Sequence, residues 1–234
     1  RTSSQLTSEI LTKVTDLIKP GVTTNEINQW VHEYTLKNNA IPAPLNYKGF
    51  PKSICTSINE VICHGIPEDR ELNEGDIINI DVTCIINGFY GDASRMYKVG
   101  KISKEAEQLI DITEQSLYKG IEAVKPGNTT GDIGYVIEEF ITPYNYGIVR
   151  EYGGHGIGRN FHEDPHIHHF GKPKTGTILE PGMVFTIEPM INEGTHKTKL
   201  LSDGWTVITA DSKLSAQWEH TICVTETGVD ILTK

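Results

Sequence analysis

The sequence predicts an α+β fold made of two related halves of about 105 residues each. Residues 19–24 (KPGVTT) recur as residues 125–130 (KPGNTT), and each copy opens a segment with helical periodicity. Residues 80–82 (IDV) are echoed at a nearly equal offset by residues 187–189 (IEP). Chance matches are the alternative explanation. If the halves are real, their sheets could join, and each half would offer a carboxylate to one shared site.

Helices are expected at residues 3–18, 103–124 and 130–143, where apolar side chains recur with the period of an α-helix. A fourth helix follows Thr23 or Thr24, because either side chain can cap a helix N-terminus. An amphipathic helix needs a partner for its apolar face, so these four helices are expected to pack on the predicted strands.

Strands are expected at residues 54–58 and 76–86, after a loop at residues 40–53 that is rich in Pro, Gly and aromatic side chains. Asn87-Gly88 is typical of a type I′ hairpin turn, which predicts a partner strand at residues 89–98. The rest of the C-terminal half is predicted to be mostly strand and loop.

The hairpin places two carboxylates close together. A two-residue turn sets Asp92 opposite Thr83 and Asp81 opposite Ser94, and side chains alternate between the two faces of a strand. Asp81 and Asp92 are therefore diagonal neighbours on one face, with Cα atoms about 7–8 Å apart. The other face is apolar and suited to helix packing. A β-bulge would shift this register.

Two further acids, Glu188 and Glu219, lie in apolar runs that are predicted to be strands. Carboxylates that share an apolar setting must be neutralised by solvent, a shared proton or a cation. For each acid alone, a solvated strand position is the alternative. Four such acids favour a site that bridges two cations.

Residues 153–158 (GGHGIG) display His155 on a glycine-rich turn. A phosphate loop is disfavoured because neither phosphate fingerprint is present and the segment holds no Lys or Arg. A structural turn and a metal-ligating His both remain. Residues 162–166 (HEDPH) match the zincin motif H-E-x-x-H, but Pro165 would break the helix that this motif needs. A solvated cluster is expected for His166, His168 and His169.

The composition is that of an ordinary globular protein, with 37% hydrophobic and 22% charged residues. The net charge of −10 disfavours nucleic-acid binding. The four cysteines form no C-x-x-C pair and are expected to be buried thiols in a reducing compartment. Neither a membrane span nor a signal-peptide core is found. With no linker or low-complexity run, residues 1–234 are expected to form one cytoplasmic domain.

The chain resembles the bacterial type I methionine aminopeptidases over nearly its whole length. The resemblance lies in the segments YKGFPKSICTSINEVICHGIP, GDIINIDVTCIINGFYGDASRMYKVG, GGHGIGRNFHEDP, PGMVFTIEPM and DGWTV…LSAQWEHT. It implies the pita-bread fold, with two pseudo-symmetric halves around a central antiparallel sheet. Two departures concern the pocket and not the reaction: Gly153 stands where many relatives carry Cys or Thr, and Pro44 where some carry Cys.

The resemblance also implies roles for individual residues. The implied ligands of two divalent ions are Asp81, Asp92, His155, Glu188 and Glu219. Among these, Asp92 and Glu219 would bridge the ions, and Glu188 could also accept a proton. Substrate-contacting and catalytic roles fall on His64 and His162. The implied methionine pocket comprises Tyr47, Phe50, Cys55, Phe161 and Trp205. A monovalent cation would bind at Asn59, Val61 and Ser215.

The implied activity is removal of the initiator methionine from nascent proteins and peptides, with a small second residue preferred. The cofactors would be two ions of Co, Mn, Fe(II) or Zn, a set that the oxygen-rich ligands do not narrow, together with one monovalent cation. The expected partners are nascent N-termini at the ribosome, with no stable nucleic-acid or membrane binding, and the expected state is a monomer.

Two alternatives remain at this stage. The first is a proline-directed aminopeptidase of the same fold, whose relatives carry a large extra N-terminal domain for which the 63 residues before His64 leave no room. The second is a metal-free binding module, which would have lost ligands that are all present here. A type II methionine aminopeptidase would add a helical insertion that the C-terminal half lacks.

Overall fold

The computed structural model describes residues 1–234 and contains four α-helices and fifteen strands. The helices are α1 (Thr2–Lys13), α2 (Thr24–Lys37), α3 (Lys104–Glu122) and α4 (Thr130–Ile141). Short 3₁₀ helices span Val14–Leu17, Tyr47–Gly49 and Thr142–Tyr144. In the first half the strands are β1 (Ile41–Pro42), β2 (Cys55–Ile58), β3 (Val61–Cys63), β4 (Ile77–Ile86) and β5 (Phe89–Lys98).

The second half is richer in short strands. They are β6 (Gly147–Ile148), β7 (Gly154–Gly156), β8 (Glu163–Ile167), β9 (Val184–Ile187), β10 (Met190–Asn192), β11 (Thr198–Leu200), β12 (Val207–Thr209), β13 (Ser215–Gln217), β14 (His220–Val224) and β15 (Val229–Ile231). The four expected helices and the β4–β5 hairpin are confirmed. The first helix ends at Lys13 and continues as 3₁₀ helix, and β3 was not predicted.

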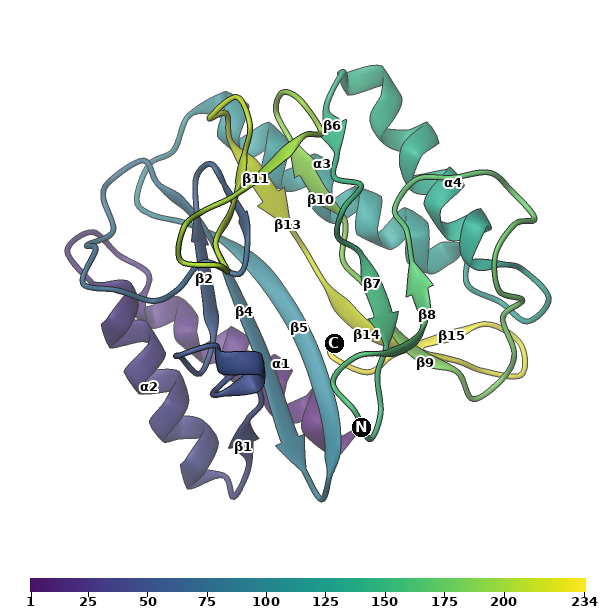
Figure 1. The fold of residues 1–234 in the computed structure, drawn as a ribbon, viewed down its shortest axis with the longest axis horizontal. Coiled ribbons are helices and arrows are strands. Elements are labelled where there is room, and N and C mark those ends of the chain that lie inside the picture. Colours follow the sequence, from purple (N-terminus) through teal and green to yellow (C-terminus); the bar gives the residue numbers. More distant parts are fainter.

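Two sheets dominate the structure. One has the order β1-β4-β2 with β5 paired to β4, and the other has the order β15-β14-β9-β7-β8. Figure 1 shows α2 on one side of the molecule and α4 on the other, with β4, β5, β13 and β14 running between them and α1 crossing behind β4 and β5. Smaller sheets, β13-β10-β6 and β11-β12-β3, complete the upper part. None of the helices is long and apolar enough to span a membrane.

The internal repeat is visible in matched backbone hydrogen bonds. Gly21 N donates to Leu72 O (2.9 Å) in the first half, and Gly127 N donates to Leu179 O (3.0 Å) in the second. Capping boxes begin both α2 and α4, in which a Thr hydroxyl accepts from a backbone N–H and an acidic side chain accepts in return. The recurrence is therefore structural, and the two-half architecture predicted from the sequence is confirmed.

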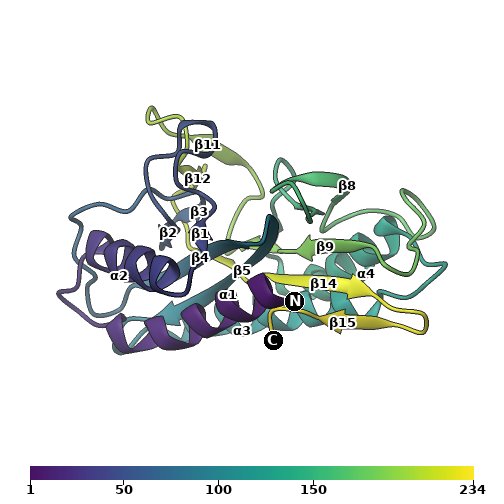
Figure 2. The same cartoon turned by 90° about the horizontal axis from the view of Figure 1, so that it is seen from below.

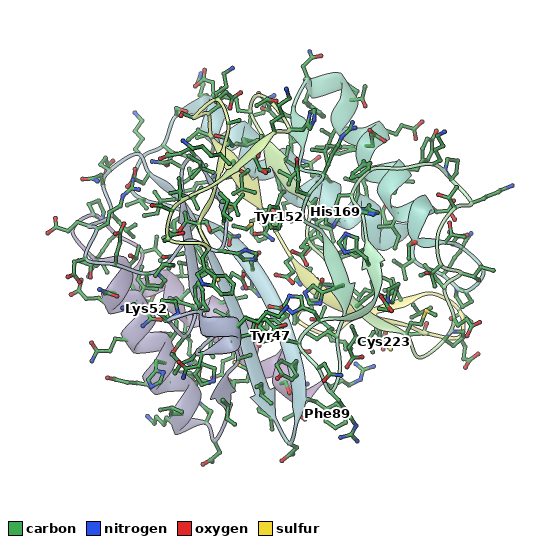
Figure 3. The ribbon with its side chains drawn as sticks, viewed as in Figure 1. Tyr47, Lys52, Phe89, Tyr152, His169 and Cys223 are labelled. Atoms are coloured by element: carbon green, nitrogen blue, oxygen red, sulfur yellow. The ribbon has the colours of Figure 1, made fainter.

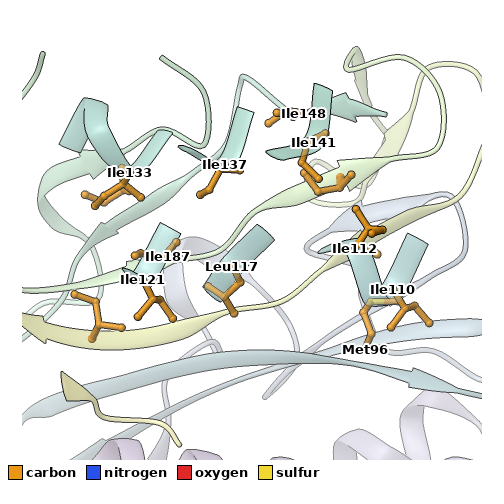
Figure 4. Close-up of a cluster of buried hydrophobic side chains, with 14 of the residues drawn as sticks. Met96, Ile110, Ile112, Leu117, Ile121, Ile133, Ile137, Ile141, Ile148 and Ile187 are labelled. Atoms are coloured by element: carbon orange, nitrogen blue, oxygen red, sulfur yellow. The ribbon is translucent and has the colours of Figure 1, made fainter. Parts of the chain in front are cut away.

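Each half has its own hydrophobic core. In the first, the apolar face of β4 packs against α1 and α2, as the hairpin register predicted. In the second, α3 and α4 pack on β9, β10, β13 and β14 (Figure 4). Figure 2 shows β8, β11 and β12 on the side of the molecule opposite α1 and α3. The helices thus support the sheets from one side and leave the other side to the loops.

The two dominant sheets meet where β5 passes β14. The Thr221 hydroxyl donates to the Asp92 carbonyl (2.7 Å) and accepts from the Asp92 N–H (3.2 Å), and Glu219 N donates to Ser94 O (3.1 Å). The sheets of the two halves therefore join, as expected from the repeat. This junction brings an acidic residue of each half, Asp92 and Glu219, to the centre of the molecule.

Candidate metal centre

A cleft of about 780 Å³ opens between the two halves. It is lined by every residue predicted to be a divalent-metal ligand: Asp81, Asp92, His155, Glu188 and Glu219. It is also lined by every residue predicted to contact substrate: Tyr47, Phe50, Cys55, His64, Phe161, His162 and Trp205. In Figure 3 the labelled Tyr47 and Tyr152 lie in this central region. Residues from distant parts of the sequence are thus gathered at one site.

The hairpin register agrees with the sequence prediction. Asp92 pairs with Thr83 and Asp81 pairs with Ser94, with no bulge between them. The Thr83 hydroxyl donates to Asp92 Oδ1 (2.7 Å), which shows that these two side chains lie on the same face of the sheet. Asp81 lies two residues from Thr83, so Asp81 and Asp92 share that face.

His155 completes the group from β7. Ligand atoms of Asp92, His155 and Glu219 all lie within 4.8 Å of one another. The Nδ1 of His155 lies 3.0 Å from Gly156 O, and because a carbonyl only accepts, Nδ1 carries the proton. The lone pair of Nε2 is then free and lies 3.8 Å from Asp92 Oδ2 and 3.7 Å from Glu188 Oε1.

Glycine lets this strand pass close to its neighbour. A Cβ atom at Gly154 would lie 2.2 Å from the carbonyl oxygen of Thr186 on β9. The glycine-rich run therefore serves the close packing of β7, and this packing sets the position of His155. Gly154–Gly156 form strand β7 and not a turn, so the structural-turn interpretation is wrong, and the metal-ligating role of His155 stays a prediction.

No basic side chain is placed to neutralise the four carboxylates when they ionise. None of them pairs with Lys or Arg. Burial raises the pKa of Asp81 to about 7 and that of Glu188 to about 8. Burial and the neighbouring carboxylates raise the pKa of Asp92 and Glu219 well above the usual range. The buried Glu219 Oε1 has no hydrogen-bond partner. An oxygen-rich, uncompensated donor set of this kind fits divalent cations.

Glu188 is held by two side chains that the sequence analysis did not single out. The Thr186 hydroxyl lies 2.7 Å from Glu188 Oε1 and accepts from the His155 backbone N–H (3.0 Å). Because an N–H can only donate, the single Thr186 proton is left for Glu188. Gln217 Nε2 donates to Glu188 Oε2 (3.2 Å). The role of Thr186 could have been found from the sequence, because residues two apart in an extended segment lie on the same face, as Thr186 and Glu188 do.

Replacing Thr186 by Val is expected to weaken divalent-metal binding by about 10–100-fold, the usual cost of removing a group that orients a ligand. Thr186 is fully buried, and Val has nearly the same shape, so packing is preserved. Thr186→Ser keeps the hydroxyl and is the matched control, expected to bind metal as the wild type does. Calorimetric titration with Mn²⁺ measures both affinities. Equal affinities for the Val and Ser variants would show that the hydroxyl has no such role.

An aromatic wall adjoins the acidic group. Phe50 and Trp205 pack edge to face with ring centroids 5.2 Å apart, and Tyr47 and Phe161 lie 4.9 Å apart. Phe50 is buried, whereas Trp205 is half-buried. The thiol of Cys55 is buried beside Asp81, its strand partner. The wall combines polarisable aromatic rings with a sulfur atom, a lining suited to an unbranched apolar side chain.

The two predicted substrate histidines line the same cleft. Burial, with a smaller contribution from His155, lowers the pKa of His64 to about 4 and that of His162 to about 3. The His162 ring lies 4.2 Å from that of His155, centroid to centroid, and the His64 ring packs edge-on against Tyr152. Both imidazoles are therefore neutral near pH 7 and can each donate one hydrogen bond.

The histidines after His162 behave differently from one another. Residues 163–167 form strand β8 and not a helix, which confirms that the H-E-x-x-H match is not a zincin site. His166 and His168 are exposed, as expected. The prediction was wrong for His169, which is buried and whose Nε2 accepts the Glu188 backbone N–H (3.0 Å). The apolar residues that cover this strand end were not visible in the local sequence.

The remaining predictions concern the cysteines and the monovalent site. All four thiols are free, as predicted, but Cys223 is only half-buried. The predicted cation residues Asn59 and Ser215 lie together, since Ser215 N donates to Asn59 O (2.9 Å). Asn59 has a positive φ of 54°, and Val61 lies nearby at the start of β3. Their cation-binding role stays a prediction.

A cleft in which two buried and two half-buried carboxylates meet a His, between two related α+β halves, has the features of a metallohydrolase site. The sequence profile of metallopeptidase family M24 matches residues 1–226, and the chain belongs to this family. It is 55% identical over 234 residues to the methionine aminopeptidase of Rickettsia prowazekii, covering 100% of this chain and 90% of that protein. It is 48% identical over 235 residues to the methionine aminopeptidase of Escherichia coli (strain K12), covering 100% and 89%.

The structural comparisons agree. The crystal structure of methionine aminopeptidase from Rickettsia prowazekii matches with a TM-score of 0.99, covering 100% of this chain and 94% of that one. A prolidase from Pyrococcus horikoshii matches with a TM-score of 0.77 at 24% identity, covering 100% of this chain and 60% of that one. The prolidase likeness shows the fold alone. Together these neighbours confirm the predicted pita-bread fold.

Proposed function

We propose that this chain removes the N-terminal methionine from proteins and peptides by metal-dependent hydrolysis, acting as one catalytic domain over residues 1–234. The observation that carries the proposal is the joining of four carboxylates and His155 in one cleft, beside an aromatic pocket. Full-length relatives at 48–56% identity that are named methionine aminopeptidases support it. Structural neighbours named as proline-directed enzymes are 22–24% identical to this chain.

The proposed cofactors are two divalent cations held by Asp81, Asp92, His155, Glu188 and Glu219. Candidate ions are Co, Mn, Fe(II) and Zn, because carboxylate and imidazole ligands suit all of them. When bound, such cations polarise a carbonyl and lower the pKa of a water molecule. A monovalent cation at Asn59, Val61 and Ser215 is a further part of the proposal.

Residues of the cleft can supply proton transfer, hydrogen bonds to the substrate and a pocket for its first side chain. Glu188 can take a proton at Oε2, the oxygen that Gln217 approaches, while Thr186 fixes the other oxygen. His162 and His64 can donate hydrogen bonds to the carbonyl oxygen and the nitrogen of the scissile bond. The aromatic wall around Phe50 excludes water and receives the first side chain. These roles supply the proton transfer, the hydrogen bonds and the side-chain pocket that the cleavage needs.

The natural substrates proposed are the N-termini of nascent proteins, met at the ribosome in the cytoplasm by a monomeric enzyme. The net charge of −10 disfavours stable binding of the chain to nucleic acid, because a phosphate backbone carries charge of the same sign. The free thiols are consistent with a reducing compartment. A small second residue is expected to be preferred, as the resemblance to the methionine aminopeptidases implies.

A peptide panel tests the proposed function. Met-Ala-Ser should be cleaved after Met, Met-Lys peptides much more slowly, and Ala-Pro peptides not at all. Activity should vanish with a chelator and return when Mn²⁺ is added, because the carboxylates alone offer no electrophile. Released amino acids are measured by chromatography. Faster cleavage of Ala-Pro than of Met-Ala-Ser would favour the proline-directed activity, and no cleavage of any peptide would favour a binding module.

A further inference from the structure

Tyr47 has a contact that lining a methionine pocket does not explain. Its hydroxyl oxygen lies 2.9 Å from Nδ1 of His162, 115 residues away in the other half of the molecule. The two rings are stacked, with centroids 5.4 Å apart and planes 24° apart. Tyr47 occupies the 3₁₀ helix Tyr47–Gly49 and projects into the central region of the cleft (Figure 3). The contact between the Tyr47 hydroxyl and His162 therefore joins the two halves of the molecule.

The direction of this hydrogen bond follows from the groups present. A neutral imidazole carries one N–H, and a phenol hydroxyl can either donate or accept. No other side-chain or backbone acceptor lies within hydrogen-bond distance of the Tyr47 hydroxyl. If Nδ1 carried the proton, the hydroxyl would accept it and its own proton would have no protein partner. If the hydroxyl donates, the proton without a protein partner is the imidazole proton on Nε2, which faces the cleft. A phenol is a much stronger acid than a neutral imidazole N–H and is therefore the better donor, so the hydroxyl donates to Nδ1 and the imidazole proton is on Nε2.

We propose that Tyr47 is a positioning residue that fixes the ring of His162 as the tautomer protonated on Nε2, so that Nε2–H faces the substrate. Nδ1 is occupied by the hydroxyl, so only Nε2 remains to meet a peptide. The opposite tautomer would direct a lone pair at a carbonyl oxygen and repel it. The donor role of His162 rests on the proposed function, whereas the tautomer itself does not.

The phenol ring and the hydroxyl of Tyr47 have separable roles. The ring packs on Phe161, with centroids 4.9 Å apart, and belongs to the pocket wall. Tyr47→Phe keeps this ring and removes only the hydroxyl. Tyr90 offers a matched control: its ring stacks on Phe161 with centroids 5.4 Å apart, and its hydroxyl makes no hydrogen bond to another protein group. Tyr90→Phe therefore removes a hydroxyl from this aromatic group without touching His162.

The tautomer can be read directly. Long-range ¹H–¹⁵N correlation spectra of the Zn²⁺-loaded protein, labelled with ¹⁵N-histidine, distinguish the two tautomers, and His162→Gln identifies the resonances. We expect His162 to be protonated on Nε2 in the wild type and in Tyr90→Phe. In Tyr47→Phe the Nδ1 resonance should lose the shift caused by the donated hydrogen bond. Protonation on Nδ1 in the wild type would overturn the proposal, whatever the peptide panel shows.

Kinetics test whether the contact matters for turnover. Tyr47→Phe should lower kcat for Met-Ala-Ser about tenfold with KM nearly unchanged, a smaller loss than the 10²–10³ typical of deleting the whole donor. In a His162→Ala background, Tyr47→Phe should cost nothing further, because the hydroxyl acts through that ring. A loss that persists in the double variant, or an equal loss in Tyr90→Phe, would overturn the proposal. A wild type without peptidase activity would instead refute the proposed function.

Discussion

Replacing Asp92 by Asn is expected to abolish divalent-metal binding and peptidase activity together. Asp92 is buried at the junction of the two sheets, and its carboxylate oxygen lies within 4.8 Å of the ligand atoms of His155 and Glu219. A neutral amide offers one weak oxygen ligand in place of a charged bidentate group. Losing several kcal/mol of electrostatic stabilisation corresponds to a fall of roughly 10³ or more in kcat/KM.

The measurement pairs kcat/KM on Met-Ala-Ser with elemental analysis of the same preparation. Asp111→Asn, which makes the same chemical change at an exposed position on α3, is the control and should behave as the wild type does. Full activity of Asp92→Asn with metal still bound would rule out the two-metal mechanism. Loss of activity with full metal content would place Asp92 in some other catalytic role.

Metal removal should also make the stability of the protein depend on pH. In the metal-free protein, burial raises the pKa of Asp81 to about 7 and of Glu188 to about 8, whereas both are near 4 in an unfolded chain. The folded state then holds protons that the unfolded state releases, so stability falls as pH rises from about 5 to 8. Asp92→Asn relieves part of the repulsion, so metal-free Asp92→Asn should melt above metal-free wild type at pH 8. An unchanged melting temperature from pH 5 to 8 would contradict this account.

The repeat and the β4–β5 hairpin could be predicted from the sequence because their signals are local. The KPG turns before α2 and α4 and the Asn87-Gly88 hairpin each specify backbone geometry within a few residues. A two-residue hairpin without a bulge then fixes which residues face each other over the whole β4–β5 pair. The relation of Asp81 to Asp92 followed from turn chemistry and strand alternation alone.

What the sequence could not provide are the contacts across the junction. Thr221 binds the backbone of Asp92 from 129 residues away, and Gln217 reaches Glu188 because β13 pairs with β10, the strand that begins two residues after Glu188. Nothing near Thr221 or Gln217 in the chain indicates these partners. His169 could not be placed from its neighbours either. The adjacent His166 and His168 suggested that it is exposed to solvent, but the fold of the second half buries it against the backbone of Glu188.

His162→Ala is expected to lower turnover by about 10²–10³ while two metal ions remain bound. The reason is geometric: His162 lines the cleft and packs on His155, but Asp92, His155 and Glu219 meet without it. Truncation therefore removes a hydrogen-bond donor and no proposed ligand. His168→Ala is the control, since this exposed histidine follows β8 and does not line the cleft.

A purely structural role for His162 makes a different prediction. If its ring only anchors the segment before Pro165, the variant should melt at a lower temperature while its folded fraction turns over at a near-normal rate. Turnover, metal content and melting measured on one preparation separate the two cases. Loss of one metal equivalent would make His162 a ligand and revive the H-E-x-x-H interpretation, although strand β8, with Pro165 in its middle, cannot present its two histidines on one helical face. We therefore expect the metal content of His162→Ala to match that of His168→Ala, with the two variants differing in kcat.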